Sequence, residues 1–160
     1  MIIRNAVPED LPEIARVERL SFPEAEAAGE DIIAGRLAVY ADRFRVAEED
    51  GRIAACVNGM LTDEPELRDE MYGNASLHDA GGGWQMIFSV CTLPEFRGRG
   101  YASALMRRLI EDVRAERRRG LVLTCKEHMT GFYAALGFAD EGISDSVHGG
   151  AVWHKMRLTL

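Results

Sequence analysis

The stretch from Val90 to Ala102 constrains this chain more than any other part of it. It begins with apolar residues typical of a buried strand, passes through Pro94, and reaches Gly98 and Gly100 directly before a helical pattern. Apolar residues then recur at the spacing of one helix face, which predicts an amphipathic helix over 98–118. A helix N-terminus presents unpaired backbone N–H groups and the positive end of the helix dipole, so this segment predicts a phosphate site.

Three kinds of phosphate-binding loop compete for this segment, and spacing separates them. A P-loop requires G-x-x-x-x-G-K-[ST], which the sequence does not contain. A dinucleotide loop requires a third glycine where Ser103 stands, and an acidic residue after the next strand, which ends instead in Thr124-Cys125-Lys126. The run from Arg97 to Ala102 has the third pattern, [RQ]-x-x-G-x-[GA]. With this run the chain resembles the GNAT superfamily of N-acetyltransferases, in which such a loop binds the pyrophosphate of acyl-CoA.

The resemblance extends from Ile2 to about Leu160. The segments Leu121–His128 and Gly131–Phe138 resemble the second half of that superfamily, where a strand leads into a short helix that carries a tyrosine. More narrowly, the chain is similar to the arylalkylamine (serotonin-type) N-acetyltransferases and their bacterial relatives. This closer likeness is carried by Ser21–Ala28, Thr62–Leu67 and Cys125–Glu127.

The length and composition fit the fold that this resemblance implies. At 160 residues, of which 47% are hydrophobic, the chain is long enough to bury one core. The implied structure is an α/β fold with a single mixed, mostly antiparallel β-sheet of about seven strands, flanked by about four helices. We therefore expect residues 1–160 to form one acetyltransferase domain.

Local patterns place the individual elements. A helix opens at Pro8 and is expected to point Leu11, Ile14, Ala15 and Leu20 inward. The pair Asp50-Gly51 predicts a tight hairpin turn, and the acid- and glycine-rich segment 62–83 predicts a long loop. Further helices are expected over 30–42, 98–118 and 129–136. Strands are expected over 1–6, 44–48, 53–60, 84–93 and 121–125, with two final strands joined near 148–150.

The resemblance implies acetyl-CoA as the co-substrate, bound by the strand that precedes the loop, by the loop itself and by the tyrosine. The implied contacts are Val90, Cys91, Thr92, Leu93, Arg97, Gly98, Arg99, Gly100, Tyr101, Ala102, Ser103 and Tyr133. Backbone N–H groups near Val90 to Leu93 are also the expected donors that polarise the thioester carbonyl.

Tyr133 is the expected catalytic acid, because a phenol with a pKa near 10 stays protonated at neutral pH and can donate to a departing thiolate. The alternative is that Phe132, Tyr133 and Leu136 only form the buried stripe of a short helix. The general base is less defined. Serotonin-type enzymes carry two histidines on the strand before the loop, and the matching positions here are Met86 and Phe88, which cannot accept a proton. Replacement candidates are Glu24, Glu26, His78, Asp63 and Glu64, although for any single one of them a solvated surface residue is the favoured interpretation.

The net charge, the apolar runs and the placement of cysteines and histidines argue against several other classes of protein. A net charge of −7 argues against a nucleic-acid partner, because the one basic run, Arg114 to Arg119, ends a predicted helix where cations offset the dipole. No apolar run approaches the ~20 residues of a membrane span, and no signal peptide is evident, so we expect a cytoplasmic protein with no membrane partner. The cysteines at 56, 91 and 125 are expected as buried thiols, and the four histidines lack metal-ligand spacing, so we expect no metal.

The sequence thus predicts an acetyl-CoA-dependent N-acetyltransferase that transfers an acetyl group directly to a primary amine, in particular a small (aryl)alkylamine. Two alternatives stay open: a protein or peptide N-acetyltransferase, and a catalytically weak acyl-CoA-binding sensor module. The expected partners are acetyl-CoA and a small amine, and the protein is expected as a monomer or a homodimer.

Overall fold

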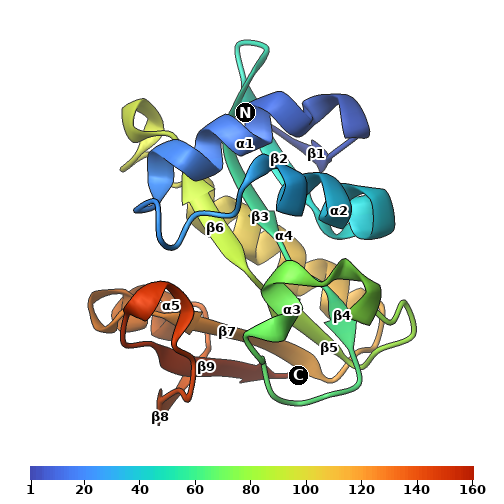
Figure 1. Cartoon of the computed structure of the whole chain (residues 1–160), viewed down its shortest axis with the longest axis vertical. Coiled ribbons are helices and arrows are strands. Elements are labelled where there is room, and N and C mark those ends of the chain that lie inside the picture. Colours follow the sequence, from blue (N-terminus) through green and yellow to red (C-terminus); the bar gives the residue numbers. More distant parts are fainter.

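The computed structural model describes residues 1–160 and contains two β-sheets (Figure 1). The first sheet has the strand order β1-β2-β3-β6 and comprises β1 (Ile2–Asn5), β2 (Arg45–Glu49), β3 (Arg52–Asn58) and β6 (Ser89–Thr92). The second has the order β4-β5-β7-β9-β8 and comprises β4 (Leu61–Thr62), β5 (Trp84–Ile87), β7 (Gly120–Cys125), β8 (Ala139–Ile143) and β9 (His154–Thr159). Every neighbouring pair is antiparallel except β5 and β7, which are parallel.

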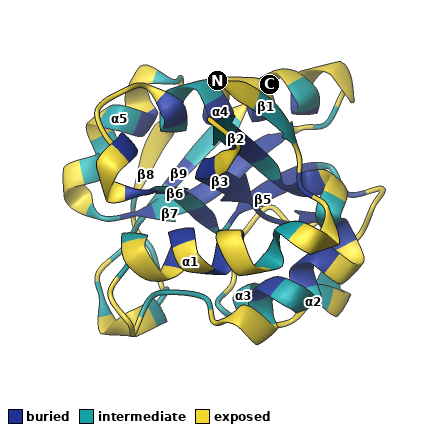
Figure 2. Cartoon of the chain, turned by 90° about the horizontal axis from the view of Figure 1, so that it is seen from above, coloured by how far each residue is buried: buried dark blue, intermediate teal, exposed yellow.

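Five α-helices cover these sheets from both sides: α1 (Leu11–Ser21), α2 (Glu30–Tyr40), α3 (Glu70–Gly73), α4 (Tyr101–Ala115) and α5 (Thr130–Ala135). Figure 2 shows α1, α2 and α3 on one face of the strands, and α4 and α5 on the other, with the buried residues between the two layers. The mixed α/β fold class expected from the sequence is therefore confirmed. No helix in the chain combines the length and the apolar character that crossing a bilayer requires.

The expected single sheet is replaced by two, because the strand predicted over 84–93 is interrupted at Phe88. Before Phe88 the chain pairs with β7, and after it the chain pairs with β3. The neighbouring chain between β3 and β4 changes sheet at the same level. There Gly59 lies so close to the Met86 carbonyl that a Cβ atom would approach its oxygen to 1.7 Å. As a result β6 and β7 diverge, and the sheet opens between them.

The buried face of α1 differs from the predicted one, because it includes Glu18 and does not include Leu20. Ile14, Ala15 and Val17 are buried as an amphipathic helix requires, but Leu20 is 44% exposed. At 100° per residue Leu20 lies about 120° around the helix from Ile14, outside its stripe. Glu18, one turn after Ile14, points inward instead and is 3% exposed.

Other local predictions are confirmed. The turn at Asp50 and Gly51 has positive φ at both residues and joins β2 to β3 as a hairpin. Helix α4 begins at Tyr101 and buries Leu105, Met106 and Leu109 against the first sheet and β7. The long segment 62–83 contains the short helix α3 and a 3₁₀ turn at Ala75–Leu77.

Candidate active site

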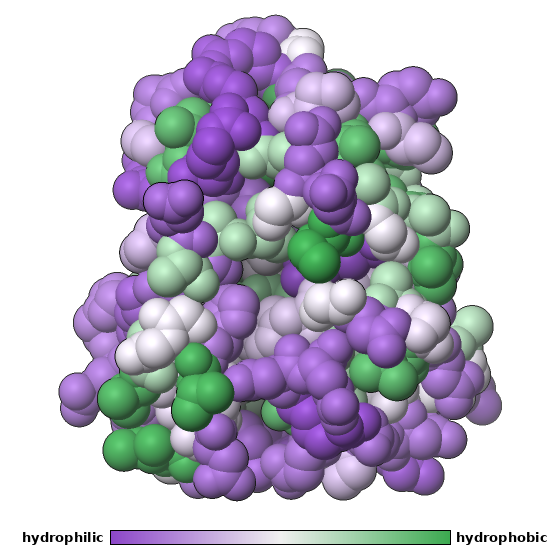
Figure 3. All heavy atoms as spheres, in the orientation of Figure 1, coloured by the Kyte–Doolittle hydropathy of each residue, from purple (hydrophilic) through white to green (hydrophobic).

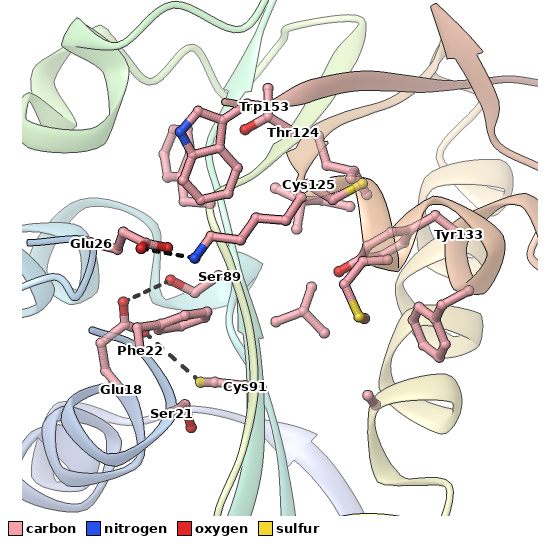
Figure 4. A pocket seen from close by; sticks show the side chains of 18 of the residues that line it. Glu18, Ser21, Phe22, Glu26, Ser89, Cys91, Thr124, Cys125, Tyr133 and Trp153 are labelled. Carbon is pink, nitrogen blue, oxygen red and sulfur yellow. Dashed lines mark hydrogen bonds and ion pairs between the residues drawn. The ribbon is translucent and has the colours of Figure 1, made fainter. Parts of the chain in front are cut away.

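The opening between β6 and β7 holds a cavity of about 470 Å³. Residues of α1, of the segment after it, of β6, of β7 and of α5 line this cavity, so it reaches both faces of the sheet (Figure 4). A second cavity of about 250 Å³ lies at the N-terminus of α4. The two adjoin, since both are lined by Thr92, Arg97, Ala102 and Phe132.

The second cavity has the features of an anion site. Gly100 caps α4 in the left-handed region with φ +83°, and no side chain accepts the first N–H groups of the helix. Added Cβ atoms at Gly98 and Gly100 would meet no atom within 4 Å, so the space above the loop is open. Arg97 contributes a positive charge beside it. A diphosphate fits these residues, because free N–H groups, the helix dipole and a guanidinium act together.

The expected cofactor contacts divide into two groups. The second cavity is lined by Arg97, Gly98, Gly100, Tyr101, Ala102 and Ser103, and the first by Val90, Cys91, Thr92 and Tyr133. Leu93 and Arg99 line neither cavity. Leu93 is buried with its N–H bonded to the Ala54 carbonyl, and the Arg99 guanidinium lies over the ring of Phe96 at 5.3 Å.

The backbone of β6 directs every second residue into the opening. Leu93 donates its N–H to β3, and alternate residues of an antiparallel strand point their backbone groups to opposite sides. Val90 and Thr92 therefore direct theirs toward the opening. The Thr92 carbonyl bears this out, since it accepts the Ser21 hydroxyl at 3.2 Å and the Arg97 Nε–H at 3.3 Å.

Glu18 is a buried carboxylate on the wall of the first cavity. It accepts the Ala28 N–H at 3.0 Å, the Ser89 hydroxyl at 3.2 Å and the Cys91 thiol at 3.8 Å (Figure 4). None of these partners is a cation, and Arg36 acts on it only at longer range. Burial raises the pKa of Glu18, and the hydrogen bonds only partly oppose this.

Sequence reasoning missed Glu18, because a glutamate within a helix is far more often exposed. A signal was nevertheless present: Glu18 follows Ile14 by one helical turn and stands beside Val17, so it belongs to the apolar face of α1. What the sequence does not show is that Ser89 and Cys91, about seventy positions later, come to face this carboxylate.

Tyr133 enters the cavity from α5, across from Glu18 (Figure 4). Its ring packs edge-on against Phe132 and Phe138, so part of its role is in the core, as the alternative interpretation requires. It is also a lining residue of the cavity. Burial raises its pKa above that of an exposed tyrosine, which keeps the phenol protonated at neutral pH.

The other expected bases are not gathered at the cavity. Only Glu26 lines it, and its carboxylate is paired with Lys126 at 2.9 Å. Glu24 is exposed and outside the lining. His78 is half-buried in a different part of the molecule, where its Nδ1 accepts the Leu61 N–H and its ring packs on Tyr40.

The acidic loop residues are likewise elsewhere. Asp63 accepts the Gly83 N–H, and Glu64 pairs with Arg68 on the surface. The histidine positions of the serotonin-type enzymes are apolar as the sequence shows: Met86 is in the core, and Phe88 lines the cavity. Local sequence could not separate these candidates, since each depends on where a distant segment packs.

The cysteines are all buried and unpaired, as expected. Cys91 and Cys125 line the cavity, but burial raises the pKa of both thiols, that of Cys125 to about 11, and the Glu18 charge adds to this at Cys91. Since the thiolate is the nucleophile, this environment disfavours an acyl-cysteine intermediate. No group of three or more His, Cys, Asp or Glu side chains is arranged to hold a metal ion.

Aromatic side chains form the outer wall of the cavity. The Tyr72 ring is stacked on His148 at 4.6 Å and lies 4.9 Å from Phe88, and its hydroxyl is 3.0 Å from the Thr124 hydroxyl. Trp153 lies beyond His148, with ring centroids 6.0 Å apart. Figure 3 shows hydrophilic atoms over much of the face seen in Figure 1, with apolar atoms in several separate patches, one of them near its middle and another at its lower left.

Comparisons with known proteins agree with this geometry. The sequence matches the acetyltransferase (GNAT) family over residues 11–138. No curated protein matches the chain. Among solved structures, the GphF GNAT-like decarboxylase in complex with isobutyryl-CoA superposes with a TM-score of 0.85 at 17% identity, covering 99% of each chain.

Two further structures show the same fold. The ribosomal-protein-S18-alanine N-acetyltransferase from Escherichia coli has a TM-score of 0.73 at 17% identity, covering 99% of this chain and 92% of that one. A GNAT family acetyltransferase from Brucella melitensis in complex with acetyl-CoA has a TM-score of 0.65 at 22% identity, covering 99% and 87%. The narrower resemblance to arylalkylamine N-acetyltransferases is not supported by these comparisons. The chain belongs to the acetyltransferase (GNAT) family and has its acyl-CoA-binding fold.

Proposed function

We propose that this protein is an acetyl-CoA-dependent N-acetyltransferase that acts on a small primary amine in a ternary complex. The observation that carries the proposal is Glu18, a buried carboxylate without a cationic partner, on the wall of a cavity that adjoins an anion site. A carboxylate of raised pKa in such a place can bind an ammonium ion and then accept its proton.

The roles follow from this placement. Glu18 takes one proton from the bound ammonium ion, and the neutral nitrogen then attacks the thioester carbon, so a C–N bond forms and the C–S bond breaks. Tyr133, on the opposite side, gives a proton to the departing CoA thiolate. The second proton that the nitrogen loses replaces the one that Tyr133 gives up. In this proposal the N–H groups of Val90 and Thr92, which point away from β3, stabilise the oxyanion and bind an extended, amide-bearing chain such as pantetheine.

The cavity wall also suggests the kind of amine. Tyr72, Phe88 and Trp153 provide apolar and aromatic surface, while Glu18 provides the charge. This combination suits a cation that carries a hydrophobic group, because desolvation favours the group and the carboxylate favours the ammonium. We therefore expect arylalkylamines such as tryptamine or phenethylamine to be better acceptors than polyamines, and polyamines better than aminoglycosides.

A decarboxylase is the competing enzyme, because the fold superposes well on a GNAT-like decarboxylase. The charge of the cavity favours the transferase. The ionised form of Glu18 would repel the carboxylate that the substrate of a decarboxylase must carry, whereas it attracts an ammonium ion.

The test is release of CoA thiol when the protein and acetyl-CoA are mixed with an amine panel, together with mass analysis of the products. The panel contains tryptamine, phenethylamine, spermidine, an aminoglycoside and N-terminal peptides. Malonyl-CoA without an amine tests decarboxylation. The proposal predicts acetylated small amines and intact malonyl-CoA. Binding of acetyl-CoA with no product from any acceptor would support the sensor alternative, and a ten-fold preference for peptides would support the peptide enzyme.

A further inference from the structure

Glu26 and Lys126 form an ion pair between two distant segments at the mouth of the cavity. Lys126 Nζ lies 2.9 Å from Glu26 Oε2, and both residues line the cavity (Figure 4). The Glu26 side chain is 8% exposed and that of Lys126 is 36% exposed. Lys126 also lies 5.9 Å from the centre of the Trp153 ring. A carboxylate that is this buried needs its partner, so the pair holds segment 22–28 against the end of β7.

A second set of contacts joins segment 22–28 to the chain between β8 and β9. His148 Nε2–H donates to the Glu26 carbonyl at 3.0 Å, and a Cβ atom at Gly149 would come within 2.6 Å of Glu26 Cγ. His148 is itself held by the Trp153 indole N–H, which donates to its carbonyl at 2.8 Å. The two segments are therefore in direct contact at Glu26.

Asp69 anchors this arrangement from the side of α3. Its carboxylate accepts the Ser146 hydroxyl at 2.5 Å and the Val147 N–H at 3.0 Å. The chain over 146–149 is thus fixed both to α3 and to segment 22–28. Glu26, Lys126 and His148 line the same cavity as Glu18, so these contacts bound the space in which an acceptor at Glu18 would lie. A compact amine needs no more than this space, whereas a peptide has to continue past the contacts of Glu26.

We propose that the Glu26–Lys126 pair is a specificity latch, which closes the acceptor side of the cavity and restricts acceptors to small amines. This inference rests on the proposed function. Glu26 is accordingly a positioning residue: it acts by holding segment 22–28 in place, and Glu18 remains the group that contacts the amine. Opening the latch admits peptide acceptors without changing the acetyl-CoA site.

The experiment compares kcat/KM for phenethylamine with that for a short peptide bearing a free N-terminal alanine. Lys126→Met removes the ion pair. Gly149→Ala places a methyl group against Glu26 from the other side and also strains its own loop, because Gly149 has φ +62°. Each variant is expected to raise the ratio of peptide to amine activity by about ten-fold or more, while the Kd for acetyl-CoA stays within about two-fold. Lys155→Met is the matched control, because Lys155 pairs with Glu66 and Glu141 and does not line the cavity.

Reversing the pair separates a latch from direct substrate contact. The double variant Glu26→Lys with Lys126→Glu restores the attraction and is expected to restore the wild-type ratio. If Lys126 instead contacts the substrate, the double variant keeps an altered ratio of peptide to amine activity. This result would overturn the latch.

Quenching of tryptophan fluorescence by acrylamide supplies a readout that needs no catalysis. Trp153 packs beside Lys126, whereas Trp84 is buried at 8% exposure in the second sheet and gives a constant signal. Lys126→Met and Gly149→Ala are expected to increase quenching. Unchanged quenching, or increased quenching with an unchanged peptide-to-amine ratio, refutes the latch. If the wild type acetylates no acceptor, the proposed function fails, and the quenching data alone decide whether the pair closes the cavity.

Discussion

At the scale of single residues, the chemistry depends on where burial changes the proton affinity of a group. Glu18 and Tyr133 face the same cavity, and burial raises the pKa of both. The effect has opposite consequences for the two. A raised pKa makes the Glu18 carboxylate a stronger base, and it keeps the Tyr133 phenol in the acid form. Burial in the same cavity therefore favours Glu18 as a base and Tyr133 as an acid, one on each side of the proposed reaction site.

The first prediction concerns Glu18. Glu18→Gln is expected to lower kcat by about 10²- to 10⁴-fold, because the amide cannot accept a proton. In the wild type, kcat/KM should fall as the pH is lowered through the raised pKa of Glu18, at a higher pH than an exposed glutamate would show. Steady-state rates across pH check both points. If Glu18→Gln keeps the wild-type rate and the same decrease of kcat/KM at low pH, Glu18 is not the base.

Stability provides the control for that variant. Because the pKa of Glu18 is higher in the folded than in the unfolded chain, the folded state binds more protons between the two values. The free energy of unfolding therefore decreases as pH rises through this window. Gln cannot ionise, so Glu18→Gln should be at least as stable as the wild type at pH 7, and thermal unfolding will show this.

The second prediction concerns Tyr133. Tyr133→Phe keeps the packing against Phe132 and Phe138 and removes only the hydroxyl, so the fold should survive. We expect kcat to fall by about 10²-fold with little change in acetyl-CoA affinity, since the proton donor for the thiolate is lost. Unaltered turnover would mean that Tyr133 serves only in packing.

At the scale of elements, the patterns that identify helices and turns were reliable where the information is local. The turn at Asp50-Gly51 and the helix after Gly100 were both predictable, because each depends on a few adjacent residues. The interruption at Phe88 was not. All four residues of β5 are buried, and β6 continues as a strand, so the local pattern looks like one long strand. Only the pairing partners, β7 before Phe88 and β3 after it, reveal the change of sheet.

The third prediction tests the N-terminus of α4 without altering a glycine. Gly100 has φ +83°, so any side chain there strains the loop as well as filling the space. Ser103→Glu avoids this: a carboxylate in the first turn suits the helix dipole, but it places a negative charge in the second cavity. We expect at least about ten-fold weaker acetyl-CoA binding with no loss of thermal stability. Titration calorimetry measures the affinity, and undiminished binding would place the pyrophosphate elsewhere.

At the scale of the whole molecule, the two cavities differ in how far apart their residues lie in the sequence. The second cavity is largely built from one contiguous run, Arg97 to Ser103, which is why the sequence alone predicted it. The first cavity joins segments across most of the chain, for example Glu26 with Lys126 and Glu18 with Cys91. Such contacts depend on the packed fold, so sequence reasoning could name the acidic residues but could not choose among them.

The fourth prediction follows from ligand linkage. A ligand that binds only the folded protein stabilises it and so raises its melting temperature. At a ligand concentration of a hundred times the Kd, the free energy of unfolding increases by about 2.7 kcal/mol. Acetyl-CoA should therefore raise the melting temperature, whereas NADH and ATP at the same concentration should not. Thermal unfolding with each ligand checks this, and an equal shift with all three would indicate nonspecific anion binding at α4.

The opening between β6 and β7 also has a consequence for amide hydrogen exchange. Val90 and Thr92 lie in β6, which pairs with β3 on one side only, and their N–H groups point away from β3, while Leu93 is bonded to it. We expect the Val90 and Thr92 amides to exchange with deuterium much faster than that of Leu93, in spite of their position within the core layer. Saturating acetyl-CoA should slow these two amides selectively. If exchange alternates along β6 without ligand and becomes uniform when acetyl-CoA binds, the ligand forms hydrogen bonds with the free backbone groups of this strand, as a neighbouring strand would.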